Sequence, residues 1–369
     1  MSRYAFVSTD VLDIAYLEWN PQGARSAVLL HGWPDSPHAW EDLAESLADA
    51  GYRVLAPALR GFAPTRFRDA STPRSGQLAA LACDLLAFVD GLALQRPLLV
   101  GHDWGARAVA SACGLREGFA SHLVMLSVGY ASNDPQQVLS LPQARSFWYQ
   151  WFMATPRGER ALREEGEAFA RQMWDTWSPP GWYAERDFQE AAQAFSGPDW
   201  VAVVLHYYRH RWGFVAGEPR YGAAEQRLLP APRLALPTLV LHGGADACTH
   251  PDGSRGREHY FSGRYQRLVL ESVGHFPQRE AAAQVADAIL RFCADDQVLD
   301  AAAADNAHGV IRPTNRCAAS GRGGRGVVSS AGGPMASAGG RAAPGSDSRP
   351  PASRTPAGRR GSPCAYWRR

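Results

Sequence analysis

The chain has 369 residues, of which 46% are hydrophobic and 10% aromatic, enough to bury a large core. Eleven Arg and two Asp give residues 301–369 a net charge of +9, and since the whole chain carries +2, residues 1–300 carry −7. The basic isoelectric point therefore belongs to the tail, and it gives no support for nucleic-acid binding by the rest of the chain.

The N-terminus has no charged segment followed by an apolar one, so we expect no signal peptide. No apolar run approaches the ~18 residues of a membrane span. The six cysteines show neither a C-x-x-C pair nor zinc-ligand spacing, which favours reduced thiols and no metal site. The sequence thus predicts a cytoplasmic protein without a membrane span, and it leaves the oligomeric state open.

Short apolar runs bounded by turn residues alternate with longer helical patterns along most of the chain. This alternation favours an α/β fold with a parallel sheet and helices on both faces. The expected strands are Ser26–Leu30, Arg53–Ala56, Pro97–Val100, His122–Ser127, Pro237–Leu241 and Arg267–Leu270. The expected helices include Gln77–Leu92, Ala106–Leu115 and Ala281–Phe292.

The alternation is interrupted between about residues 131 and 233, where aromatic residues are frequent and no strong strand pattern occurs. We interpret residues 131–233 as a helical cap, inserted into a core formed by residues 1–130 and 234–298 and covering the carboxyl ends of the strands. From residue 299 on, branched apolar residues are almost absent, which predicts a disordered tail over residues 299–369.

The segment Gly101-His102-Asp103-Trp104-Gly105 follows an apolar strand and precedes a helical pattern. A sharp strand-to-helix turn of this kind, flanked by glycines, is typical of a nucleophile elbow, which projects its central side chain above the sheet. The central residue is Asp rather than Ser. A carboxylate can attack an electrophilic carbon and form a covalent ester, so we expect alkyl-transfer chemistry rather than serine-type ester hydrolysis.

Further candidate residues follow other strands, in the order that such a site requires. The strand that ends in HGWP places the backbone N–H of Trp33 where it could form an oxyanion hole with that of Trp104. Asp246 ends the segment LVLHGGAD, and His275 follows the last strand in RLVLESVGHF. The series predicts Asp103 as nucleophile, Asp246 as the acid and His275 as the base, with Asp134 as the alternative acid.

The segments HGWPDSPHAW, LRGFAPTRF, VGHDWGAR, LVLHGGAD and VGHFPQRE together resemble the motif set of the α/β-hydrolase-fold epoxide hydrolases, over roughly residues 8–297. The resemblance implies an α/β-hydrolase fold and the opening of an epoxide to a vicinal diol. It implies an ester on Asp103, which water activated by His275 then hydrolyses. The expected partners are therefore a small epoxide-type substrate and water, with no cofactor, no metal and no nucleic acid, and the aromatic residues of the cap suggest that the substrate is apolar.

Two cap segments extend the resemblance. FWYQWFMATP resembles the helix that carries the first epoxide-activating tyrosine of that family, which falls here on Tyr149. LHYYRHRW resembles the segment with the second, which falls on Tyr208, with Tyr207 as the alternative. Other side chains are expected to surround the substrate, namely His31, Trp148, Trp151, Phe152 and Phe276.

Two alternative functions remain. Haloalkane dehalogenases share Asp103-Trp104 but usually carry Asn at the position of Trp33, and haloacetate dehalogenases usually carry Arg at the position of Trp104, so that this chain keeps only Arg107 of their pattern. A non-catalytic binder of the same fold would typically lack one member of the catalytic set, and none is missing here. Both alternatives are therefore less favoured than epoxide hydrolysis.

Overall fold

The computed structural model describes residues 4–131 and 137–307, and for residues 296–307 it describes only the backbone. All of these residues belong to a compact unit that ends at Val310. Asp134 lies outside the described residues. So does the predicted tail, except for residues 299–307, which continue the last helix. No helix among the described residues is long and apolar enough to cross a membrane.

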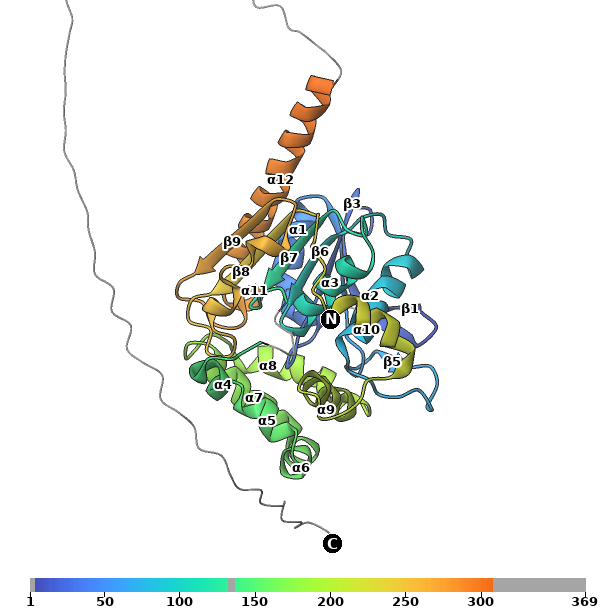
Figure 1. The fold of residues 1–369 in the computed structure, drawn as a ribbon, viewed down its shortest axis with the longest axis vertical. Coiled ribbons are helices and arrows are strands. Elements are labelled where there is room, and N and C mark those ends of the chain that lie inside the picture. The colour runs from blue at the N-terminus through green and yellow to red at the C-terminus, as the bar shows by residue number, and fades with distance from the viewer. Residues whose placement is uncertain (1–3, 132–136, 308–369) are drawn as a thin grey trace, which may run out of the picture. The chain divides into compact units, whose positions relative to one another are not determined.

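A single mixed sheet forms the centre of this unit (Figure 1). Its neighbouring strands follow the order β1-β2-β4-β3-β6-β7-β8-β9, parallel from β4 to β9, while β1 and β2 are antiparallel and β5 pairs with β2. The strands are β1 (Ala5–Ser8), β2 (Leu12–Trp19), β3 (Arg25–Leu30), β4 (Tyr52–Pro57), β5 (Arg66–Phe67), β6 (Leu98–His102), β7 (His122–Leu126), β8 (Thr238–Gly243) and β9 (Tyr265–Leu270). The six predicted strands are confirmed to within two residues at each end, whereas β1, β2 and β5 are additions to the prediction.

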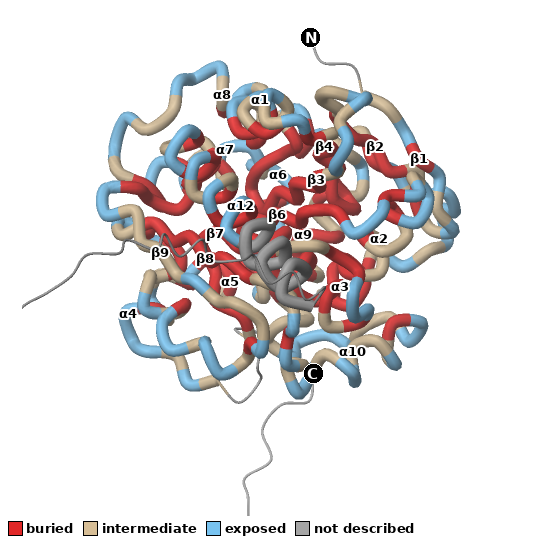
Figure 2. The backbone as a smooth tube through the Cα atoms, turned by 90° about the horizontal axis from the view of Figure 1, so that it is seen from above, coloured by how far each residue is buried: buried red, intermediate tan, exposed pale blue. Residues whose placement is uncertain are grey.

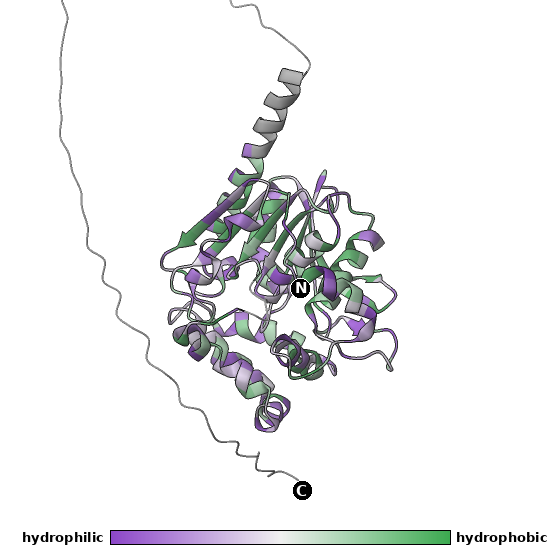
Figure 3. Ribbon diagram, in the orientation of Figure 1, coloured by the Kyte–Doolittle hydropathy of each residue, from purple (hydrophilic) through white to green (hydrophobic). Residues whose placement is uncertain are grey.

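Helices cover both faces of the sheet, as the continuous apolar strands require. Successive side chains of a strand point to opposite faces. Accordingly, Ala27 and Leu29 of β3 pack toward α1 and α12, whereas Val28 and Leu30 pack toward α2 and α3. These helices are α1 (Glu41–Asp49), α2 (Leu78–Gly91), α3 (Trp104–Leu115) and α12 (Ala282–Ala307). The inner strands β3, β4, β6, β7 and β8 are accordingly mostly buried, and the sheet is largely apolar (Figures 2 and 3).

Between β7 and β8 the chain forms helices without any strand among its described residues. They are α4 (Leu141–Ser146), α5 (Trp148–Met153), α6 (Pro156–Glu164), α7 (Gly166–Trp177), α8 (Glu185–Ala192), α9 (Trp200–Arg211) and α10 (Gly222–Leu228). The remaining short helices are η1 (Pro37–Trp40), η2 (Gln193–Ser196), η3 (Pro219–Tyr221), η4 (Pro251–Ser254), η5 (Glu258–Tyr260) and α11 (Pro277–Glu280).

The inserted helices contact the loops at the carboxyl ends of the strands. The indole N–H of Trp174 in α7 donates to the carbonyl of Pro34, in the loop after β3, at 2.7 Å. Tyr149 of α5 stacks on Trp33 of the same loop, with ring centroids 5.5 Å apart. Helix α10 differs, because it packs on α2 and α3, which cover one face of the sheet. The insertion therefore covers the end of the sheet where the predicted catalytic residues stand.

Candidate active site

Asp103 occupies a sharp turn between β6 and α3. Its backbone has φ +49° and ψ −114°, a conformation that side chains other than glycine seldom adopt. The neighbouring backbone is packed closely, since a Cβ at Gly105 would overlap the carbonyl oxygen of Leu30, and one at Gly32 would lie 2.5 Å from the Cβ of Asp103. The turn thus holds the Asp103 carboxylate in a buried position next to the loop that follows β3.

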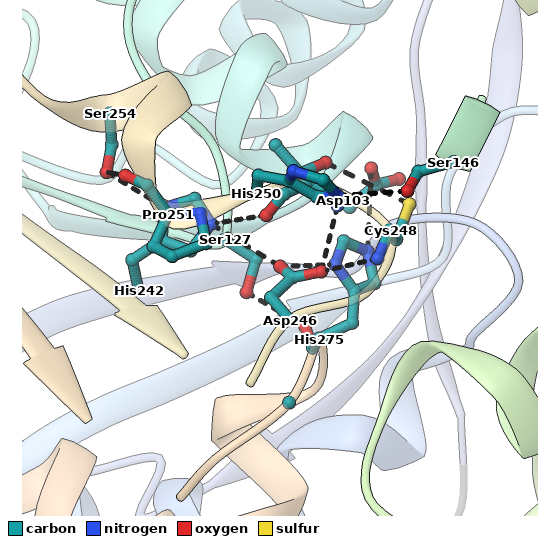
Figure 4. Close-up of polar contacts among 12 residues, drawn as sticks. Asp103, Ser127, Ser146, His242, Asp246, Cys248, His250, Pro251, Ser254 and His275 are labelled. Atoms are coloured by element: carbon teal, nitrogen blue, oxygen red, sulfur yellow. Dashed lines mark hydrogen bonds and ion pairs between the residues drawn. The ribbon is translucent and has the colours of Figure 1, made fainter. Parts of the chain in front are cut away.

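Two more strand ends bring His275 and Asp246 to this carboxylate (Figure 4). Nε2 of His275 lies 3.9 Å from Oδ2 of Asp103, too far for a direct hydrogen bond. Nδ1 of His275 lies 2.8 Å from Oδ2 of Asp246. Because the carboxylate accepts the Nδ1 proton, Nε2 keeps a free lone pair toward Asp103, and among the described residues it has no hydrogen-bond partner. This arrangement can take a proton from a water molecule beside Asp103.

Asp246 is held as an ionised carboxylate. Its Oδ1 accepts hydrogen bonds from the backbone N–H groups of Cys248 and Thr249, both at 2.8 Å. Burial alone would raise the pKa of this carboxyl group, but His275 and His242 outweigh that effect and lower the pKa to about 2. For His275, burial lowers the pKa, and the Asp246 carboxylate overcomes this and leaves the pKa raised. The Asp246 carboxylate therefore stabilises the imidazolium that forms when His275 takes up a proton.

The backbone of His275 is fixed from several sides. Its N–H donates to Oγ of Ser178, from the segment after α7, at 2.8 Å. Its carbonyl accepts from Oγ of Ser127 at 2.8 Å and from Nε2 of His102 at 2.7 Å. The Ser178 hydroxyl in turn donates to Glu280 at 2.6 Å. The histidine is thus positioned by both the sheet and the insertion.

The two predicted tyrosines lie side by side in the insertion. Tyr149 and Tyr208 are buried, with their rings edge-to-face at 5.3 Å, and both rings contact that of Trp33. Burial raises the pKa of both phenols well above 10, and the Asp103 carboxylate adds to the increase, so both stay protonated. The Tyr208 hydroxyl has no hydrogen-bond partner among the described residues. Both hydroxyls therefore keep a proton with which they can donate a hydrogen bond.

Tyr207, the alternative to Tyr208, is placed differently. Its ring stacks on that of Trp104 at 4.6 Å, and its nearest neighbours include Gly76 on the core. It contacts neither Tyr149 nor Trp33, whereas Tyr208 contacts both. The geometry favours Tyr208 over Tyr207 as the partner of Tyr149.

Trp33, predicted to contribute to the oxyanion hole, donates its backbone N–H to Oδ1 of Asp103 at 3.1 Å. Trp104, the other predicted donor, begins α3 directly after Asp103. The donor that touches the carboxylate in this structure is thus the Trp33 amide, and the role of the Trp104 amide stays a prediction.

A cavity of about 390 Å³ adjoins the site between α3, α9 and α10. Such a volume suits a small-molecule ligand. The cavity shares Trp104 with the site, but Asp103 and His275 do not line it. Its other polar lining groups include Arg107, Arg211 and Glu225.

Within residues 4–131 and 137–295, one cluster has ligand atoms close enough together to hold a metal ion, namely His38, Glu41 and Glu190. It contains none of the predicted catalytic residues. Nδ1 of its imidazole already lies 2.8 and 3.3 Å from oxygens of the two carboxylates, so the three side chains already contact one another.

A family model described as alpha/beta hydrolase fold matches residues 28–282 of the chain. Epoxide hydrolase A of Mycobacterium tuberculosis is 27% identical over 315 residues, which cover 78% of this chain and 95% of that protein. Among solved structures, a candidate epoxide hydrolase from Klebsiella pneumoniae is 35% identical with a TM-score of 0.75, covering 79% of this chain and 97% of that one. The chain belongs to the epoxide hydrolases of the α/β-hydrolase family.

The residues predicted to surround the substrate of this epoxide hydrolase do not line the cavity of about 390 Å³. His31 accepts a hydrogen bond from the Leu59 N–H through Nε2, which ties two loops together. Trp148 is 45% exposed, and Trp151 packs on Trp212. Phe152 stacks on Phe169, and Phe276 stacks on Trp182 beside His275. Their part in substrate binding stays a prediction, best supported by position for Phe276.

Sequence reasoning did not identify Gln150 or Ser178 in this epoxide hydrolase, although each contacts a predicted catalytic residue. Gln150 donates to the Tyr149 hydroxyl, and Ser178 accepts from the His275 N–H. Neither residue stands in a motif with a strand before it. Their contacts depend on how the insertion folds onto the sheet, which no local pattern encodes.

Replacing Gly105 with alanine is expected to lower the free energy of unfolding of this epoxide hydrolase by ~1–3 kcal/mol or more. The reason is that the new Cβ meets the rigid Leu30 carbonyl rather than a flexible side chain. Gly222→Ala is the matched control, since a Cβ there meets nothing within 4 Å and its φ is −58°. Urea unfolding followed by circular dichroism would measure both. Equal unfolding free energies for the two variants would contradict the tight packing of the turn.

Proposed function

We propose that the protein hydrolyses small apolar epoxides to vicinal diols through a covalent ester on Asp103. One observation carries the proposal: a buried carboxylate, held at a strained turn, stands next to a pair of buried, protonated phenols. An epoxide needs a nucleophile at carbon and a proton donor at oxygen at the same time, because its alkoxide is a poor leaving group. The site offers both.

In the first half-reaction, an oxygen of Asp103 attacks an epoxide carbon, and the C–O bond of the ring breaks. Tyr149 and Tyr208 hydrogen-bond to the ring oxygen, which takes a proton from one of the phenols. The Trp33 N–H, which already holds Oδ1 of Asp103, would leave Oδ2 as the attacking atom, the one that faces His275. The products of this step are an alkyl ester and a phenolate.

In the second half-reaction, His275 takes a proton from water, and the hydroxide attacks the carbonyl carbon of the ester. The amides of Trp33 and Trp104 would stabilise the tetrahedral oxyanion, each contributing about 3 kcal/mol. The imidazolium then protonates the departing diol oxygen. The carboxylic acid formed on Asp103 returns its proton to the phenolate, which restores the starting state without any cofactor.

Residues 1–298 would contribute two parts to the reaction, a core and a cap. Residues 1–130 and 234–298 are proposed as the catalytic core, and residues 131–233 as the cap that supplies both phenols. The cavity of about 390 Å³ beside Trp104 is proposed as the space through which the non-reacting part of the substrate approaches. Its apolar lining residues, which include Leu78, Met125 and Leu228, suit an apolar group.

The assay that tests the proposal gives the purified protein styrene oxide, 1-bromobutane and fluoroacetate in parallel, and measures diol and free halide. We expect phenylethanediol from the epoxide and no halide. Phenols can donate hydrogen bonds to an alkoxide oxygen, whereas dehalogenation needs hydrogen-bond donors placed around a leaving halide ion. Halide release without diol formation would indicate that the protein is a dehalogenase. Diol formation that equals the rate without protein would contradict catalysis of epoxide opening.

A further inference from the structure

The amide side chain of Gln150 is buried between the two tyrosine-bearing parts of the insertion. Its Nε2 donates to the Tyr149 hydroxyl at 2.8 Å, and its Oε1 accepts from the indole N–H of Trp212 at 2.9 Å. Gln150 is 1% exposed, and Trp212 directly follows α9, the helix that carries Tyr208. The amide therefore links the two phenol-bearing helices through hydrogen bonds.

The Trp212 indole fixes the direction of this link. An indole N–H can only donate, so the amide oxygen of Gln150 must face it, and the NH₂ group must face the Tyr149 hydroxyl. Because an amide NH₂ group cannot accept, the hydroxyl of Tyr149 acts as acceptor toward Gln150. Its own proton must point elsewhere.

The Tyr149 hydroxyl also lies 3.6 Å from the sulfur of Cys248, and it interacts with the neighbouring phenol of Tyr208. A neutral thiol is a weak acceptor, and burial raises the pKa of Cys248, which keeps it neutral. An epoxide oxygen next to the Tyr208 hydroxyl would be a better acceptor. The contacts thus leave the Tyr149 proton available to a substrate.

We infer that Gln150 is a positioning residue that directs the Tyr149 proton toward the epoxide oxygen and stabilises the charge that develops on the phenol oxygen as the proton leaves, with Trp212 holding the amide in place. This inference rests on the proposed function. In the first half-reaction the phenol becomes a phenolate, and a hydrogen bond donated to that oxygen strengthens as its negative charge grows. Gln150 takes no part in the second half-reaction, which Asp246 and His275 perform.

Single-turnover experiments with styrene oxide separate the two half-reactions, because the mass of the Asp103 peptide reports the formation and the decay of the ester. For Gln150→Met, which has similar length but no donor, we expect ester formation to slow about ten-fold, the scale of one lost hydrogen bond. For Gln150→Glu we expect a larger loss, since a carboxylate would accept the Tyr149 proton. Ester decay should stay within about two-fold of the original rate for both.

Two controls distinguish positioning from a structural effect. Trp212→Phe keeps an aromatic ring but loses the N–H. It should also slow ester formation, but by less than Gln150→Met does. In a Tyr149→Phe background, Gln150→Met should cause no further loss, because there is no proton left to direct. Thermal unfolding of each variant by circular dichroism would show that the fold is retained.

The possible failures differ from one another. If Gln150→Met slows ester formation and ester decay equally, or slows the Tyr149→Phe protein as much as the original, Gln150 acts only through packing and the inference is wrong. If the unsubstituted protein turns over epoxide and Gln150→Met forms ester at the original rate, the inference alone fails. If the unsubstituted protein forms no ester on Asp103, the proposed function fails, and this inference with it.

Discussion

Asp103→Asn is expected to lower epoxide hydrolysis by ~10⁴-fold or more, the scale seen when an enzyme loses its nucleophile. Asparagine has nearly the same shape as aspartate, tolerates a positive φ better than most residues, and can still accept the Trp33 N–H through its amide oxygen. The change therefore removes the negative charge that attacks carbon while it keeps the turn. Diol formation from styrene oxide, measured with a large excess of protein, gives the residual rate.

The matched control for this variant is Asp252→Asn. Asp252 lies in η4 with its side chain 79% exposed, and its carboxylate pairs with Arg255 at the surface. We expect its activity and its melting temperature to equal those of the original protein. If Asp103→Asn retained a tenth or more of the activity with an unchanged melting temperature, another group would have to be the nucleophile.

The sequence predicts that Asp103, Asp246 and His275 lie at one edge of the sheet because each follows a strand: Asp103 directly after β6, Asp246 in the loop after β8 and His275 in the loop after β9. In a parallel sheet the carboxyl ends of neighbouring strands share one edge, so three separate segments meet there without any knowledge of long-range packing. The turn at Asp103 is also marked locally by Gly101 and Gly105. In the structure, the imidazole of His275 lies 3.9 Å from the carboxylate of Asp103 and 2.8 Å from that of Asp246.

The parts that the sequence does not predict depend on packing between distant segments. Strand β2 pairs antiparallel with β4, so its register depends on tertiary contacts and not on an alternation with helices. Helix α10 lies within the range interpreted as the cap but packs on α2 and α3. Ser178 reaches His275 across 97 positions of the chain. No local pattern could reveal such a contact.

His275→Gln is expected to trap the ester on Asp103 when the protein is given an epoxide. The first half-reaction needs the carboxylate and the phenols, all of which this variant retains, so the ester should still form. The second needs a base near Asp103, and glutamine cannot take a proton from water at neutral pH. Loss of a general base typically slows a step by ~10²–10⁴-fold, enough for the ester to accumulate. Mass spectrometry of the digested protein should show the Asp103 peptide heavier by the mass of one epoxide.

His259→Gln is the matched control, because His259 is exposed on η5. This variant should turn over epoxide without accumulating an ester.

A complementary readout uses the unsubstituted protein in ¹⁸O-labelled water. Hydroxide attack at the ester carbonyl carbon places the first labelled oxygen in the Asp103 carboxylate, whereas direct attack of water on the epoxide places it in the diol. A diol labelled in the first turnover, or an added mass on a peptide without Asp103, would contradict the two-step route, because His275 would then activate water against the epoxide itself.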